Sequence, residues 1–335
     1  AFGAAESVAS QSIEYSHIAV AFSIFVLISM MCEKIQQSTG NMIIPMVQGL
    51  VGAIINIILD PLMIFGVGPF PRMGVAGAAL ATVLAQGIVT GMFWLAARRD
   101  TILFPQIRLF APSEKQAWGE ILKIGLPVSV QSMFFSSLSM FLARIVAGWG
   151  DAAIAAQKVG TQIESISYTT AEGFATAVNA FVAQNFGAGK PERIRRGYWT
   201  AIGMITVWSC FTTVMLVVFP EPLFRVFIQE EDVLQTGVSY LRIMGYSQIL
   251  MCLEITASGA FQGLGRPMPP TLAGIIGNAA RIPMALLLSA TALGLDGVWW
   301  SISISSIAKG LVVFAWFVVV LRRYLRSEED RLPGA

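Results

Sequence analysis

The sequence predicts an all-α integral membrane protein with nine transmembrane helices within its 335 residues. Hydrophobic residues make up 55% of the chain and charged residues 13%, and the mean hydropathy of +0.69 is too high for a soluble domain. Nine mostly apolar runs each reach the roughly 20 residues that cross a bilayer. In addition, three of these runs resemble three later ones, as in proteins built from repeats.

The nine predicted spans are bounded by turns or by charged residues. The fifth is longer than a bilayer requires and carries Lys158, Glu164 and Glu172, which indicates a tilted helix with one face turned away from lipid. The predicted spans cover residues 15–36, 42–66, 74–97, 121–147, 153–186, 197–219, 234–261, 269–293 and 297–321.

Charge, cysteine and histidine content exclude several classes of protein. The net charge of 22 basic minus 20 acidic residues, +2, is too small for a nucleic-acid-binding protein. Cys32, Cys210 and Cys252 lie in apolar runs without metal-site or disulfide spacing, and His17 is the only histidine. No phosphate-binding Walker A loop occurs among the glycines. We therefore expect neither an enzyme nor an ATPase, and no cofactor.

The distribution of Lys and Arg predicts the orientation in the membrane. The segments that follow the odd-numbered spans hold thirteen of these residues, whereas the segments after the even-numbered spans hold only Arg72 and Arg225. Because positive connections stay inside, the C-terminus is predicted to be cytoplasmic and the N-terminal segment external.

An internal repeat relates the first three spans to the last three. Residues 6–52 match residues 231–277 at ten of 47 positions with an offset of 225, and the next turn matches after a five-residue shift. The middle three spans have no counterpart, so the repeat predicts an absent three-helix unit before Ala1. The matched turn residues are Gln37 with Gln262, Gly40 with Gly265, Pro45 with Pro270, Gly74 with Gly294, and Gly77 with Gly297.

The charged and proline-containing stretch in the middle of the chain predicts a boundary between two lobes. We expect a partial first lobe at residues 1–99, a cytoplasmic linker at 100–120, a second lobe at 121–325 and a cytoplasmic tail at 326–335.

Several motifs resemble those of bacterial multidrug and toxic compound extrusion (MATE) transporters. In the first lobe these are NIILDPLMIFG at residues 56–66 and GVAGAALAT at 74–82. In the second lobe GFATA at 173–177, AQNFGAGKPER at 183–193 and QGLGRP at 262–267 are similar to segments of the same family. Together they cover the chain from the end of the third family helix to the twelfth.

The resemblance implies a twelve-helix antiporter with two six-helix lobes related by parallel repeats around a central cavity. Such a protein exports amphipathic or cationic organic compounds in exchange for Na+ or H+, in the plasma membrane. We expect a monomer that contacts small molecules and lipid and binds no nucleic acid. Family helices one to three, with the first-helix aspartate of many members, are missing here. No carboxylate lies near Phe135, where some members have one.

Asp60 is the main candidate for ion coupling. A charged carboxylate in hydrocarbon costs at least ~2.5 kcal/mol, so it must be paired, protonated or hydrated. Asn56 lies one helical turn before it, Pro61 weakens the adjacent backbone bonds, and Thr82 on the next helix adds a hydroxyl. These oxygens suit Na+, and the carboxylate can instead take a proton. The structural alternative is an aspartate bonded to backbone at the proline.

Five polar residues in the second lobe are candidates for the substrate cavity. They also have structural interpretations, because acidic side chains can pair and amides can join helices. We further expect Glu254 and Arg281 to form an interhelical ion pair, while the partner of Lys309 stays open. The cavity candidates are Glu164, Glu172, Gln131, Gln162 and Asn179.

Two alternatives to a multidrug exporter remain. A related lipid-linked oligosaccharide flippase would share the fold but favour a more cationic cavity. A truncated, inactive product is the other.

Overall fold

The computed structural model describes residue 13 and residues 15–18, 20–68, 70–99 and 115–329, and every regular element in it is a helix. The chain divides into two compact units, residues 1–112 and residues 113–335. This division falls inside the predicted linker at 100–120, most of which lies outside the described residues. The described part of that linker is already helical, because α5 begins at Lys115.

The described residues of unit 1 form three long helices. α4 packs against both α2 and α3, which have few contacts with each other. Gly66, in the left-handed conformation, closes α3 and donates its N–H to the carbonyl of Leu62. The helices are α2 (Ser23–Ser38), α3 (Ile43–Phe65) and α4 (Val75–Arg99).

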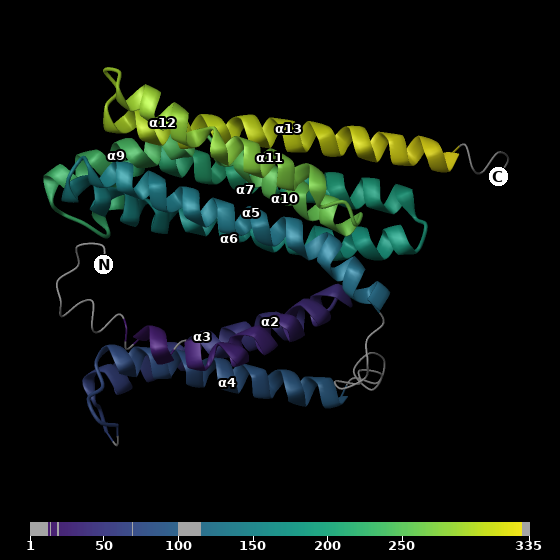
Figure 1. Cartoon of the computed structure of the whole chain (residues 1–335), viewed down its shortest axis with the longest axis horizontal. Helices are drawn as coiled ribbons and strands as arrows, with labels where there is room; N and C mark the ends of the chain where they lie inside the picture. The colour runs from purple at the N-terminus through teal and green to yellow at the C-terminus, as the bar shows by residue number, and fades with distance from the viewer. Residues whose placement is uncertain (1–12, 14, 19, 69, 100–114, 330–335) are drawn as a thin grey trace. The chain divides into compact units, whose positions relative to one another are not determined.

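Unit 2 contains nine described helices, and Figure 1 shows α5, α6, α7 and α13 running along a common direction within it. α13 packs against α10, α11 and α12, and α10 packs most extensively against α6. The helices are α5 (Lys115–Ala147), α6 (Asp151–Gly187), α7 (Pro191–Val218), α8 (Pro220–Arg225), α9 (Glu231–Gly245), α10 (Gln248–Gly263), α11 (Met268–Ala279), α12 (Arg281–Ser289) and α13 (Leu295–Glu329).

Six segments among the described residues are long and apolar enough to cross a membrane. The other three predicted spans correspond to α2, to α6 and to α9 with α10, and their membrane crossing stays a prediction. α2 has only 16 residues, and α6 carries the three charges noted in the sequence. The six segments are Ile43–Phe65, Val75–Arg98, Ile121–Ala147, Pro191–Val218, Met268–Ser289 and Leu295–Arg326.

Two of the predicted spans are interrupted in their middle. The span at 234–261 is formed by α9 and α10, which meet at Tyr246 and Ser247, and the span at 269–293 is formed by α11 and α12, which meet at Ala280. The hydroxyl of Ser247 donates to the carbonyl of Met244 at the first of these bends, at 2.9 Å. The interruptions place Gln248 and Arg281 at the first positions of α10 and α12.

The internal repeat consists of two trios of spans, the first three and the last three of the predicted nine. In each trio a glycine at the equivalent position lies close to the backbone of a neighbouring helix. A Cβ on Gly77 would lie 2.5 Å from the carbonyl oxygen of Met63, and one on Gly297 would lie 2.5 Å from that of Leu288. Met63 and Leu288 are themselves related by the offset of 225. Each trio therefore brings two backbones together through the same glycine, where any larger side chain would clash.

A further close approach joins α10 to α6. Gly259 and Gly263 form a GxxxG pattern, and a Cβ on Gly259 would lie 2.3 Å from the carbonyl oxygen of Ala175 on α6. Around this contact, the rings of Tyr198, Phe261 and Phe317 join α7, α10 and α13, with centroid distances of 4.4 and 5.0 Å to Phe317. These contacts fix α10 and α13, which carry Glu254 and Lys309.

Candidate functional site

Unit 1 contains a cavity of about 380 Å³ between its three helices. Asn56 and Thr82 both line it, and the Asn56 amide donates to the Thr82 hydroxyl at 3.4 Å. Thr82 in turn donates to the carbonyl of Ala78 at 3.0 Å. The structure thus brings together two of the three residues predicted for ion coupling.

Asp60 lies in the last two turns of α3, next to Pro61. Its Oδ1 atom is buried and has no hydrogen-bond partner within the described ranges. A buried acceptor without a donor costs about 1–3 kcal/mol, and more when it is charged. This oxygen therefore has the properties of a group that takes a proton, a cation or a donor from outside the described residues. Its role in coupling stays a prediction.

Glu33 is a cavity residue that the sequence reasoning missed. It lines the same cavity from α2, and the amide of Gln37 donates to its carboxylate at 2.7 Å. No signal in the sequence marked this role, because Glu33 lies next to Lys34 near the end of the first predicted span. The other polar residues that line the cavity are Ser29 and Gln86.

Glu164 lies at the meeting point of α6, α9 and α10 in unit 2. Its carboxylate accepts from the Tyr240 hydroxyl at 3.2 Å and from the Gln248 amide at 3.0 Å. The Thr161 hydroxyl lies 3.1 Å from the Tyr240 oxygen. Glu164 is therefore held by hydrogen bonds from neutral side chains inside the unit.

The prediction that Glu254 forms an ion pair with Arg281 is wrong. Glu254 pairs with Lys309 at 3.2 Å, with exposed fractions of 13% and 11%, which also answers the question of the partner of Lys309. Arg281 donates instead to the hydroxyls of Ser305 and Ser306 at 2.7 and 2.9 Å. The reason is that α13 packs against both α10 and α12, so its side chains meet both charges.

The remaining cavity candidates do not gather around Glu164. Glu172 and Gln162 are exposed, and Asn179 and Gln131 are partly buried. The Gln131 side chain lies against Gly274 of α11. Binding of substrate by these residues stays a prediction.

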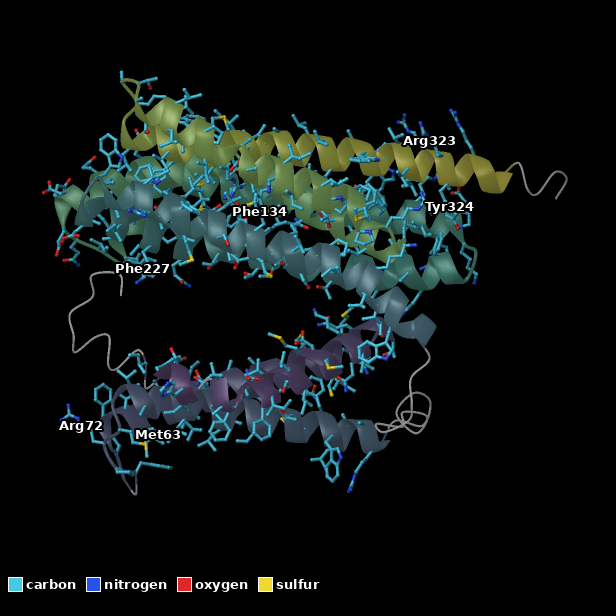
Figure 2. The ribbon with its side chains drawn as sticks, viewed as in Figure 1. Met63, Arg72, Phe134, Phe227, Arg323 and Tyr324 are labelled. Atoms are coloured by element: carbon cyan, nitrogen blue, oxygen red, sulfur yellow. The ribbon has the colours of Figure 1, made fainter. Side chains whose placement is uncertain are left out.

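The described residues contain no group of three or more His, Cys, Asp and Glu side chains placed to hold a metal ion. The candidate polar side chains form one set in unit 1, with Asn56 and Thr82, and another in unit 2, with Glu164. Figure 2 shows the side chains of both units, with Arg323 and Tyr324 at one end of unit 2 and Phe227 at the other.

Comparison with known proteins gives a consistent result. The MatE family model matches residues 1–62 and 127–287. A probable multidrug resistance protein NorM from Thermotoga maritima is 28% identical over 297 residues, covering 87% of this chain and 63% of the relative. An FAD transporter from Shewanella oneidensis is 27% identical over 264 residues, covering 78% of this chain and 57% of the relative. The chain thus spans about three-fifths of these curated relatives.

The fold is also that of solved transporter structures. A MOP superfamily transporter from Pyrococcus furiosus, described by a binding pocket of reverse polarity that suggests a different function, superposes with a TM-score of 0.87 at 25% identity. The match covers 96% of this chain and 72% of that one.

Proposed function

Because the chain belongs to the MatE family, whose members are membrane transporters and not enzymes, we propose that it forms part of a secondary active exporter. The exporter moves amphipathic or cationic organic compounds out of the cell in exchange for Na+ or H+. The multidrug name of the Thermotoga relative supports this substrate class. The names of the Thermotoga and Shewanella relatives do not favour an oligosaccharide flippase.

The complete protein in this proposal has twelve helices in two lobes, of which this chain supplies residues 1–99 of the first lobe and 121–325 of the second. The equivalent glycine contacts in the two trios support the parallel repeat. The protein is a monomer in the plasma membrane, with the tail at 326–335 and the linker at 100–120 in the cytoplasm.

Asp60 is the coupling residue of unit 1 in this proposal, and Asn56 and Thr82 supply further oxygen ligands. The observation that carries the assignment is the buried Oδ1 atom of Asp60 that lacks a donor. A buried oxygen of this kind gains a partner when a cation or a donor binds, and this removes the cost of the unsatisfied acceptor. Coupling requires such a difference between the two transport conformations.

The substrate contacts the polar residues of α5 and α6 in unit 2, namely Glu172, Gln131, Gln162 and Asn179. Glu172 is exposed on α6 and so is available to attract a cationic compound. Glu164 is already hydrogen-bonded to Tyr240 and Gln248, so it contributes to the field of the cavity more than to direct contact.

The test uses the full-length protein in liposomes with an imposed Na+ or H+ gradient. Asp60→Asn keeps the side-chain shape and removes the titratable group, so we expect substrate binding to persist while gradient-driven export is lost. Asp151→Asn is the matched control, because Asp151 is exposed in the first turn of α6. Export by Asp60→Asn at the rate of the unmodified protein would refute the assignment.

A further inference from the structure

The charged residues inside unit 2 form one connected set that the proposed coupling at Asp60 does not use. Arg281 interacts electrostatically with both Glu164 and Glu254, and Glu254 is paired with Lys309. Two acidic and two basic groups therefore balance when all are ionised. They come from α6, α10, α12 and α13, so the set joins four helices of the same unit.

The internal repeat shows what stands at the same places in unit 1. With the offset of 225, Arg281 corresponds to Asn56 and Glu254 to Ser29. With the shifted offset of 220, Lys309 corresponds to Val89.

The structure supports these correspondences independently of the sequence match. A Cβ on Gly52 would meet the side chain of Val89, and a Cβ on the equivalent Gly277 would meet the side chain of Lys309. Moreover, Ser29 lies 2.6 Å from Thr90 of α4, just as Glu254 pairs with Lys309 of α13. The helices that correspond in the repeat are thus joined by neutral side chains in unit 1 and by charged side chains in unit 2.

This difference changes the ligands that each unit offers to an ion. In unit 1, Asn56 offers a carbonyl oxygen to a cation, whereas in unit 2 the guanidinium of Arg281 offers only donors. The hydroxyls of Ser305 and Ser306 already accept from that guanidinium. A metal cation entering unit 2 would meet two fixed positive charges and few free oxygen ligands.

A proton, in contrast, needs only one acceptor and one carboxylate. Gln248 is fully buried; its Nε2 donates to Glu164, while its Oε1 has no hydrogen-bond partner in the described part of the chain. If the amide turns over, Oε1 can accept the new O–H of a protonated Glu164. The side chain of Gln248 can therefore donate a hydrogen bond to the ionised carboxylate of Glu164 and accept one from its protonated form.

We propose that Glu164 is a proton-binding site of unit 2, and that Arg281 and Lys309 make this site specific for H+ over Na+. One proton from water adds to a carboxylate oxygen of Glu164 and returns to water when it leaves. The inference extends the proposed ion coupling to a second group but concerns binding, so it is measured without transport. The charged and titratable groups around Glu164 are Tyr240, Cys252 and Arg281, with Glu254 and Lys309 beyond them.

The experiment measures protonated carboxyl groups by infrared difference spectroscopy between acidic and neutral buffers. It uses purified full-length protein carrying Asp60→Asn, so that the proposed coupling group of unit 1 contributes nothing. We expect a carboxyl band that Glu164→Gln removes and that Glu172→Gln, two turns along the same helix, leaves in place. Persistence of the band in Glu164→Gln would overturn the proposal. Failure of the transport test on Asp60 would not affect this result.

A second arm tests ion specificity. With Arg281 intact, we expect saturating Na+ to leave the Glu164 band unchanged. In Arg281→Asn, which restores the residue type of unit 1, Na+ should displace the proton and weaken the band. Loss of the band to Na+ with Arg281 intact, or no Na+ effect in Arg281→Asn, would overturn the assigned specificity.

If Glu164→Gln does not yield a monodisperse protein, Tyr240→Phe takes its place. Removing the phenol removes one hydrogen bond to the carboxyl group, so the band should shift in frequency. An unshifted band would mean that it does not come from Glu164.

Discussion

Replacement of Lys309 by Met would leave the carboxylate of Glu254 without its partner. The Met side chain keeps the apolar stem that lies against Gly277, so the change removes the charge and little packing. The two side chains are only 11% and 13% exposed, so water cannot replace the lost ammonium group. Breaking a buried pair in this way costs about 3–5 kcal/mol. Because some exposure remains, we expect about 3 kcal/mol.

The same residues provide a test of the reason for this cost. Adding Glu254→Gln to Lys309→Met removes the unpaired charge, so the double variant should recover most of the loss. The difference between the double variant and the sum of the single variants then measures the interaction itself.

The assay is thermal unfolding of the purified full-length protein in detergent, followed by tryptophan fluorescence. A loss of about 3 kcal/mol corresponds to a Tm lower by about 6–12 °C for a unit of this size. Arg225→Ala is the control: Arg225 lies 2.9 Å from Glu221, closer than Lys309 to Glu254, but the two side chains are 56% and 52% exposed. An exposed pair of this kind contributes about 0.5 kcal/mol or less. The reasoning would be refuted if Lys309→Met had the same Tm as the control, or if the Tm of the double variant were as low as that of Lys309→Met.

Two further predictions concern packing and orientation. Gly259→Val should prevent α10 from approaching α6 and lower the yield of folded protein in size-exclusion chromatography, because its Cβ would overlap the backbone of Ala175. Gly203→Ala on α7 should be tolerated, since a Cβ there meets nothing within 4 Å, and equal yields of the two variants would contradict this account. In a background without native cysteines, Arg193→Cys should be protected from an impermeant thiol reagent in intact cells and Arg225→Cys should be labelled. Labelling in the reverse pattern would overturn the predicted orientation.

Much of the fold could be predicted from the sequence because its signals are local. Long apolar runs that end at glycine or charge determine spans such as α3, α4 and α7, since a bilayer requires about 20 apolar residues. The repeated turn glycines likewise indicated which helices are equivalent, because Gly74 and Gly294 both adopt positive φ values, 56° and 53°. The family resemblance followed from motifs that are contiguous in the chain, and the family match agrees with it.

The pairing of the buried charges was decided only by the tertiary structure. The sequence places Glu254 and Arg281 on consecutive spans, but it does not show which helix passes beside them. That helix is α13: its Lys309 pairs with Glu254, and its Ser305 and Ser306 accept hydrogen bonds from Arg281. The bends before Gln248 and Arg281 were also missed. No proline lies beside the first, whereas Pro283 follows the second and removes the backbone donor to Ala279. A buried charge is stabilised by whichever partner the packing brings within hydrogen-bonding distance, and that distance depends on how the helices pack, which spacing along the chain does not specify.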